Sequence, residues 1–304
     1  MNIQDYLKGN RYTEIRVGQS GADVWEINGT AILKYVERRK LEGPLFDTYA
    51  REALFYRSRA DAPRGYLPEV LDLEISDDEI VLLLKKYESP ERGSLDESLI
   101  RKITRALASV HADSIPEFMN ADRKTAAPLS GQQIEECLSG WKSVLAEHPE
   151  LPDDAPLDTV AEKINRIIAW HDSEERVLVH GDFHWDNLLT DSSGNVLICD
   201  WQSVGLGGAS GDLSFFLSRL GSDGVRPDPD LFLRAYSEAA EEITGRPVNA
   251  EALAGHMAAA NVITSFVFWH LYLHGADAER VRGIYGRMAE DYRAWNRAAE
   301  ICGG

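Results

Sequence analysis

The chain has 304 residues, of which 44% are hydrophobic and 27% are charged, with no low-complexity segment and no internal repeat. These proportions are ordinary for a soluble globular protein, and the length suffices for two lobes with a sizeable core. The formal net charge of −18 makes binding to nucleic acid or to an anionic membrane surface unfavourable.

The negative charge is concentrated in the second part of the chain. Residues 1–88 contain 13 basic and 16 acidic residues, a net charge of −3, whereas residues 89–304 contain 19 and 34, a net charge of −15. Such an acidic field would attract a cationic small molecule to the second part. Acidic surfaces also serve solubility alone, so both explanations stay open.

Cysteine usage and apolar stretches indicate a cytoplasmic protein. The three cysteines are scattered and have the spacing of neither a disulfide framework nor a zinc site. The first eight residues lack the apolar core of a signal peptide. The longest apolar stretch, 258–273, is interrupted by polar residues such as Asn261 and His270, so we expect a buried helix and no membrane span. We expect a monomer or a dimer.

The first part of the chain is mainly strand-like. Residues 11–17 and 23–27 alternate as strands, 31–35 form a third, and 80–87 form the most continuous apolar strand of this half. The segment between the first two strands, 18–22, contains two glycines. Glycines at such a turn let backbone amides approach a phosphate closely, although most turns of this kind are only hairpins.

A lysine and a glutamate in this half form a candidate pair. Lys34 lies near the end of the third strand, where a lysine is more often a solvated edge residue. Residues 46–59 have helical spacing and carry Glu52, which gives the lysine a partner. Glu42 is the alternative partner, but it precedes Gly43-Pro44 and so is expected in a loop.

Residues 89–93 mark the boundary between two lobes. Beyond them the patterns are helical: one amphipathic helix ends near His111, and two more lie between 130 and 172. His111 is expected to be a packed structural histidine. We therefore expect an N-terminal lobe of residues 1–88 and a mostly helical C-terminal lobe of residues 89–304.

The stretch 177–200 contains the largest group of candidate catalytic residues. Short apolar runs, bounded by turn signals, indicate a hairpin flanking a polar loop, and that loop contains Asp182 and Asn187. The last apolar run ends at Asp200. A carboxylate near a reacting hydroxyl, with an amide oxygen and a second carboxylate able to hold a divalent metal, is suited to phosphoryl transfer.

This arrangement resembles a known family. Asp182 and Asn187, separated by four residues and followed by Asp200, are similar to the catalytic loop and metal-binding aspartate of the protein-kinase-like fold. The His-Gly-Asp opening of the loop resembles the aminoglycoside phosphotransferase and choline kinase branch. Typical protein kinases have Arg in place of Gly181 and Phe-Gly in place of Trp201-Gln202.

The resemblance implies an α+β, bilobal protein-kinase-like fold, with a small antiparallel sheet and one helix in the N-terminal lobe and a larger, mostly helical C-terminal lobe. It implies that Asp182 orients the acceptor hydroxyl and accepts its proton. It also implies that Asn187 and Asp200 hold Mg²⁺. The nucleotide-binding residues that it implies for ATP or GTP are Ser20, Gly21, Lys34, Glu52, Leu84 and Lys85.

The identity of the acceptor is open. An aminoglycoside or a similar cationic antibiotic fits the acidic second lobe, but choline, homoserine, methylthioribose and ketosamine kinases share the same residue types. One rival is a catalytically silent nucleotide-binding module, against which the full residue set argues. The other is a metal hydrolase built on His180, Asp182 and His184, which leaves Lys34 and Glu52 unexplained.

Two further features are interpreted as structural. Asp212 begins a helical pattern and fits either a brace for the catalytic loop or a helix N-cap. His270 and His274 are four residues apart, a spacing that on one helix face can bind zinc. No third ligand is evident, so we expect core or pocket histidines.

Overall fold

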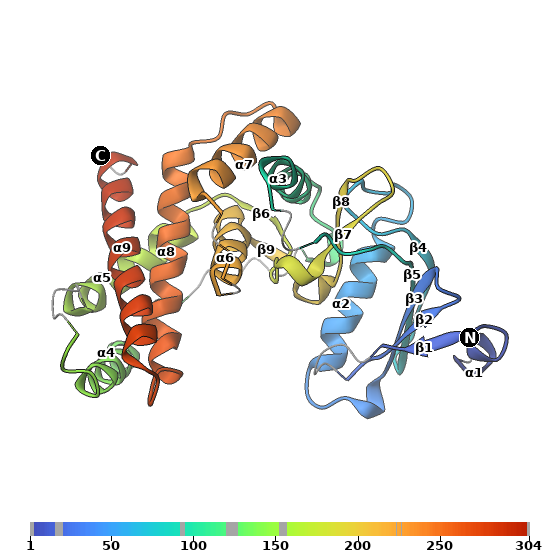
Figure 1. Ribbon diagram of the computed structural model, residues 1–304, viewed down its shortest axis with the longest axis horizontal. Helices are drawn as coiled ribbons and strands as arrows, with labels where there is room; N and C mark the ends of the chain where they lie inside the picture. Colours follow the sequence, from blue (N-terminus) through green and yellow to red (C-terminus); the bar gives the residue numbers. More distant parts are fainter. Residues whose placement is uncertain are drawn as a thin grey trace.

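The computed structural model describes residues 3–15, 21–91, 95–119, 127–151, 157–222, 224–225 and 227–302. An antiparallel sheet with one helix against it forms one lobe, and helices dominate the other (Figure 1). The sheet ends at Lys85 and the first helix of the second lobe begins at Glu97. The expected boundary at 88/89 lies between these two residues.

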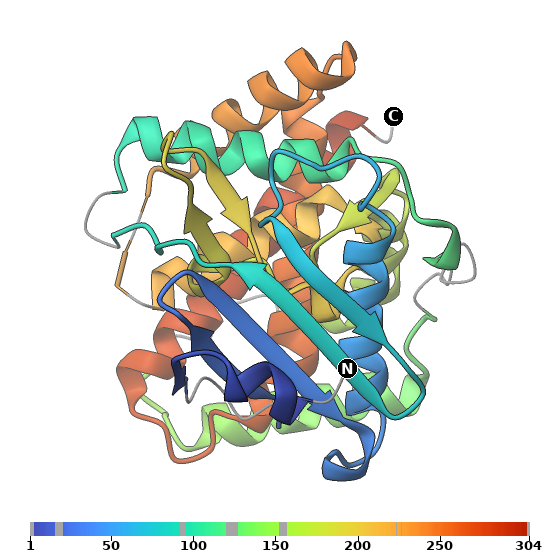
Figure 2. The same cartoon turned by 90° about the vertical axis from the view of Figure 1, so that its right-hand side faces the viewer.

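The N-terminal sheet has the strand order β1-β2-β3-β5-β4, and every neighbouring pair is antiparallel. Figure 2 views it with the N-terminal helix in front and the other helices behind it. Strand β5 is an interior strand, which explains its continuous apolar sequence. The elements of this lobe are α1 (Ile3–Lys8), β1 (Tyr12–Glu14), β2 (Asp23–Ile27), β3 (Ala31–Glu37), α2 (Leu45–Arg57), β4 (Val70–Ile75) and β5 (Glu79–Lys85).

Helix α2 packs on the sheet through one apolar face, as its spacing predicts. Phe46, Tyr49 and Ala53 are buried and cluster with Val36 and Ile80 of the sheet. Positions three and four apart on a helix share a face, so the same turn also directs Glu52 inward. This places a carboxylate, 1% exposed, between the sheet and the second lobe.

Seven described helices make up most of the C-terminal lobe. Several begin at residues that cap them: the side chains of Asp96, Asp228 and Asn249 accept backbone N–H bonds, and Ser130 forms a capping box with Gln133. The helices are α3 (Glu97–His111), α4 (Gly131–Ala146), α5 (Leu157–Asp172), α6 (Ala209–Ser222), α7 (Pro229–Thr244), α8 (Ala250–Phe268) and α9 (Ala278–Cys302).

Two short antiparallel pairs surround the predicted catalytic loop. Strands β7 (Leu188–Thr190) and β8 (Val196–Ile198) form the expected hairpin. Strand β6 (Arg176–Val179) does not join them but pairs with β9 (Gly205–Gly208). The expected hairpin beside a polar loop is therefore present as β7–β8, and the first apolar run pairs instead with a glycine-rich strand that was not predicted.

One hydrophobic cluster crosses from lobe to lobe. Phe55 and Leu82 of the N-terminal lobe share it with Ile103 of α3, Ile198 of β8 and Trp201. The ring of Trp201 lies 4.4 Å from that of Phe55, centroid to centroid. A shared core fixes the two lobes relative to one another and so positions the residues that lie between them.

A second cluster holds α4, α5, α8 and α9 together. Helix α8 with its following turn, Ala250–Leu271, has the length and apolar composition of a membrane span. Here it packs against α5, α6 and α9. Val262 and Phe266 are fully buried in this cluster. The predicted buried helix is therefore present over 258–266, whereas Phe268, Leu271 and Tyr272 at the end of the stretch are exposed.

Candidate active site

The loop between β6 and β7 begins at His180, which is fully buried. Its Nε2 lies 2.9 Å from the carbonyl oxygen of Cys199, and its Nδ1 accepts the amide N–H of Asp182 at 3.3 Å. A carbonyl can only accept, so the proton of the imidazole is on Nε2. Burial lowers the pKa of His180 and keeps the ring neutral.

Asp212, in the first turn of α6, holds the start of this loop. Its Oδ2 accepts the amide N–H of His180 at 2.7 Å, and its Oδ1 accepts that of Gly181 at 2.9 Å. His111 lies against the same carboxylate, with Nε2 3.3 Å from Oδ2. Burial acts to raise the pKa of Asp212, but these partners outweigh it and lower the pKa. Asp212 therefore braces the loop, and His111 is the structural histidine predicted.

Gly181 has no room for a side chain. Its φ is +79°, and an added Cβ would lie 2.3 Å from the carbonyl oxygen of Ser203. The left-handed conformation and the close backbone approach both require glycine. This gives a physical reason for glycine here, where typical protein kinases have arginine.

Asp182 has 42% of its side chain exposed, whereas His180 and Asn187 of the same loop are buried. His184 Nε2 lies 3.5 Å from its Oδ2. A hydrogen bond from His184 is the main reason why the pKa of Asp182 is lowered. The carboxylate is therefore ionised at neutral pH and able to accept a hydrogen bond from a hydroxyl group.

Asn187 and Asp200 are the predicted metal ligands, and both carry side-chain oxygen atoms. The Asn187 amide group donates from Nδ2 to the carbonyl oxygen of Asp182 at 2.9 Å, which leaves its Oδ1 as an acceptor. Asp200 has a left-handed backbone, with φ +63°, an uncommon conformation for a residue other than glycine. Amide and carboxylate oxygens are the hard ligands that suit Mg²⁺, so this donor set fits the metal.

Lys34 connects the sheet to these groups. Its Nζ lies 2.8 Å and 3.1 Å from the two Glu52 oxygens and 3.2 Å from Asp200 Oδ1. Burial alone would lower the pKa of Lys34, but the two carboxylates outweigh it and raise the pKa, so the ammonium is charged. The structure pairs Lys34 with Glu52 rather than with Glu42.

Two neighbours of Asp200 were noted in the sequence as a difference from typical protein kinases, without a contact assigned to them. Gln202 Nε2 donates to Asp200 Oδ1 at 2.7 Å, and the Trp201 amide donates to Glu52 Oε1 at 3.3 Å. Both residues occupy the positions where typical protein kinases have Phe-Gly. That difference was the signal in the sequence that could have indicated them.

The predicted nucleotide loop is described only in part. Ser20 lies outside the described residues. Gly21 has φ +78°, and an added Cβ would lie 2.6 Å from Leu41 Cδ2, so glycine is required there as well. The structure therefore explains Gly21 as a turn residue, and its contact with a phosphate stays a prediction.

The predicted hinge follows strand β5. Leu84 is half-buried within the sheet, and Lys85 is exposed. The amide of Lys85 donates to the carbonyl oxygen of Glu69 at 2.9 Å, and that of Lys86 to Thr30 at 2.8 Å. These two amides are already in use, so a nucleotide base would need other backbone groups of the hinge.

The alternative metal hydrolase fails on geometry. Both ring nitrogens of His180 face backbone groups, one the Cys199 carbonyl and the other the Asp182 amide. A zinc ligand needs a free ring nitrogen lone pair. His180, Asp182 and His184 therefore do not form a three-ligand site.

The structure also shows where the two histidines near the end of α8 lie. The α-helix ends at Phe268, His270 lies buried in a 3₁₀ turn, and His274 Nδ1 lies 2.8 Å from Glu147 Oε1. The two histidines are not on one helix face. The core placement expected for His270 is confirmed, and His274 is instead an exposed residue with a carboxylate partner.

Comparison with known proteins agrees with the site geometry. A family model described as the phosphotransferase enzyme family matches residues 11–252, which is more than three quarters of the chain. None of the curated proteins compared with the chain matches it.

Solved structures share the architecture at low identity. The chain resembles ADP-bound aminoglycoside phosphotransferase APH(2'')-Ib, with 16% identity, a TM-score of 0.58, and coverage of 95% of this chain and 97% of that one. It resembles the GDP complex of aminoglycoside 2'-phosphotransferase-IIIa with 12% identity and a TM-score of 0.54, and the match covers 92% of each chain. It also resembles an ethanolamine kinase from Plasmodium vivax with 10% identity and a TM-score of 0.55, and the match covers 96% of this chain and 83% of that one. The expected bilobal, protein-kinase-like α+β fold is confirmed.

Proposed function

The chain belongs to the phosphotransferase enzyme family, and on that premise we propose that it transfers the γ-phosphoryl group of ATP or GTP to a hydroxyl group of a small cationic molecule. The observation that carries the proposal is the meeting of Lys34, Glu52 and Asp200 beside the loop of Asp182 and Asn187. These groups come from both lobes, and their residue types suit phosphoryl transfer.

Asp182 is the group that acts on the acceptor. Its ionised carboxylate accepts the hydrogen bond of the attacking hydroxyl, orients the oxygen toward the phosphorus and takes up the proton. The transition state of phosphoryl transfer is loose, so orientation and charge compensation contribute most of the rate. The brace from Asp212 to the loop amides serves this orientation.

Lys34 and the oxygen ligands act on the nucleotide. Lys34, held by Glu52, supplies positive charge for the phosphates. Asn187 and Asp200 would hold Mg²⁺, which when bound neutralises negative charge on the phosphate oxygens. Lys34 contacts Asp200 directly. When a nucleotide is bound, its phosphate, which carries more negative charge than a carboxylate, would take the place of Asp200 beside Lys34.

An aminoglycoside or similar cationic antibiotic is the acceptor class that we favour. The net charge of −15 in residues 89–304 supports a cation, and two of the similar structures are described as aminoglycoside phosphotransferases. The alternative is a metabolite such as choline, homoserine, methylthioribose or a ketosamine. The ethanolamine kinase among the similar structures supports that alternative. We propose that the reaction takes place in the cytoplasm.

An acceptor panel separates these classes. Nucleotide consumption is measured with Mg²⁺ and either ATP or GTP, in the presence of aminoglycosides, choline, ethanolamine, homoserine or sugar derivatives. We expect stimulation by a cationic aminoglycoside. Stimulation by a metabolite alone would contradict the proposed aminoglycoside acceptor and support the proposed phosphoryl transfer. Nucleotide binding without turnover on any acceptor would favour the silent module.

A further inference from the structure

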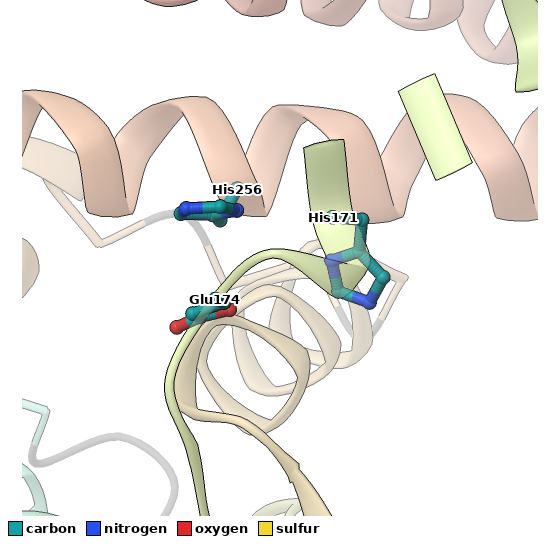
Figure 3. Close-up of side chains that lie close together, drawn as sticks. All are labelled: His171, Glu174 and His256. Carbon is teal, nitrogen blue, oxygen red and sulfur yellow. The ribbon is translucent and has the colours of Figure 1, made fainter. Parts of the chain in front are cut away.

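Three side chains converge in the helical lobe, outside the candidate active site. His171 lies in the last turn of α5, Glu174 in the turn before β6, and His256 on α8. Their ligand atoms all lie within 4.8 Å of one another, a grouping found among the described residues. Figure 3 shows the Glu174 carboxylate beneath the His256 ring, with His171 beside both.

Two ring nitrogens of this group have no hydrogen-bond partner. Nδ1 of His171 and Nδ1 of His256 are buried, and within the described part of the chain nothing pairs with either. His256 is only 9% exposed, and the Trp170 ring stacks on it at 5.3 Å between centroids and 24° between planes. A buried polar atom without a partner costs free energy and calls for an ion or a water as the explanation.

Glu174 is held in place from the other side. Its Oε1 accepts the amide N–H of Ser210 at 3.0 Å, and its Oε2 accepts the Ser210 hydroxyl. Each carboxylate oxygen keeps a second lone pair. Hydrogen bonds of this kind orient a metal-ligating carboxylate.

We propose that His171, Glu174 and His256 bind one divalent cation of the zinc class. Two imidazoles and a carboxylate, with water at the remaining position, form a known ligand set for zinc. Hard cations such as Mg²⁺ prefer oxygen ligands, so two imidazoles select against them. Zinc bonds of about 2.0–2.2 Å place tetrahedral ligand atoms about 3.4 Å apart, so the three side chains draw together when the ion binds.

The ion ties together segments that support the catalytic loop. Glu174 precedes β6, which leads directly into His180. Its partner Ser210 lies two residues before Asp212, the brace of the same loop. The site therefore joins α5, α8 and the start of α6. Its ligands touch none of the groups assigned to phosphoryl transfer, so its role is to stabilise this part of the lobe.

Metal binding is tested on the full chain after removal of metals with a chelator. Calorimetric titration with Zn²⁺ should give one ion per chain, and Mg²⁺ and Ca²⁺ should give no binding at this site. Co²⁺ should produce visible absorption bands, which a merely structural histidine cluster would not. The variants His171→Ala, His256→Gln and Glu174→Gln should each weaken Zn²⁺ binding by at least roughly 100-fold.

The matched control is His274→Ala, which removes a histidine with a glutamate partner elsewhere in the same lobe. It should bind Zn²⁺ as the unchanged protein does, and Zn²⁺ should raise its Tm but not that of His171→Ala. His171 is half-buried at a helix end, so its variant is expected to fold, which circular dichroism checks. Absence of Zn²⁺ binding, or binding lost in His274→Ala and kept in His171→Ala, overturns the proposal.

Discussion

The side chain of Asp212 fixes the start of the proposed catalytic loop. One buried carboxylate accepts the amides of both His180 and Gly181 and faces His111. A buried charge is stable only when its lone pairs are used. Asp212 satisfies this condition and fixes two consecutive peptide groups just before Asp182.

Replacing Asp212 with Asn should disturb both stability and turnover. One amide N–H would face an NH₂ group instead of an oxygen, which leaves a buried donor unpaired at a cost of about 1–3 kcal/mol. Urea denaturation measures this loss, and the acceptor assay should show a lower kcat. Asp230→Asn, an exposed change in the first turn of α7, is the control. Wild-type stability and kcat in Asp212→Asn would contradict the brace.

At the scale of elements, β3 and α2 are joined by a buried ion pair beside their apolar contact. Glu52 is almost completely buried and bonds Lys34 with both oxygens. Breaking one side of a buried pair leaves the other charge without compensation. The helix and the strand are therefore coupled through a contact that also positions Lys34.

Glu52→Gln should raise the KM for the nucleotide and lower the free energy of unfolding by roughly 3 kcal/mol or more. Lys34 would keep only Asp200 as an anionic partner. Kinetics at varied nucleotide concentration, together with urea denaturation, measure the two effects. Glu42→Gln is the control, because Glu42 lies in the loop before α2. An equal effect of the two changes would show that Lys34 does not depend on Glu52.

Helices α8 and α9 meet at a carboxyl group with an unusual pKa. Burial raises the pKa of Asp291 to about 7, and Asn261 donates a hydrogen bond to it at 3.3 Å. A carboxyl whose pKa is raised on folding stabilises the folded state in its protonated form. This contribution is lost as the pH rises from the ordinary value through about 7.

Asp291→Asn should therefore stabilise the protein at alkaline pH. The gain in free energy of unfolding should grow between pH 4 and pH 7 and level off above, at about 1–4 kcal/mol. Denaturation at pH 5 and pH 8 tests it, with Glu279→Gln, an exposed change on the same helix, as control. A gain that does not change with pH would mean that Asp291 does not titrate in this range.

The elements also show what sequence patterns can predict. The apolar alternation and turn residues predict the β7–β8 hairpin, and helical spacing predicts the inward position of Glu52 on α2. Strand β9 was missed because glycines have low strand propensity. Gly207 lies so close to Val179 that an added Cβ would stand 3.3 Å from a methyl group, a tertiary requirement that no local pattern expresses.

The rest of the candidate site depends on distant residues. Gln202 meets Asp200 through the left-handed backbone at Asp200, which a sequence does not reveal. His171 and His256 are separated by more than eighty residues, so their meeting depends on how α5 packs against α8. The roles of Ser20, Gly21, Leu84 and Lys85 stay predictions.

At the scale of the whole molecule, protonation of a buried histidine should make the fold less stable in acid. The pKa of buried His180 is lowered, so below pH 6.5 the unfolded chain binds a proton that the folded chain does not. This contribution is complete above pH 6.5 and is lost as the pH falls toward the folded-state pKa. The pKa of Asp212 is also lowered, so protonation of this carboxylate reduces the free energy of unfolding further below pH 3.8.

The contribution of His180 to the free energy of unfolding should fall by about 1 kcal/mol per pH unit below pH 6.5, whereas the contribution of Asp291 changes in the opposite direction. Urea denaturation between pH 7.5 and pH 5 measures the slope. His180→Gln should have a smaller slope, because glutamine does not titrate. An unchanged slope in this variant would assign the acid sensitivity to other groups.

The most direct test of the phosphotransferase account is the turnover of Asp182→Asn on the acceptor found by the panel, with nucleotide affinity measured by calorimetry on the same sample. Asp61→Asn, an exposed turn residue of the N-terminal lobe, is the matched control. We predict that kcat falls by roughly 100- to 10,000-fold with nucleotide affinity retained, and that the control keeps full activity. Full turnover in Asp182→Asn would contradict the assignment of Asp182 and, with it, the proposed mechanism.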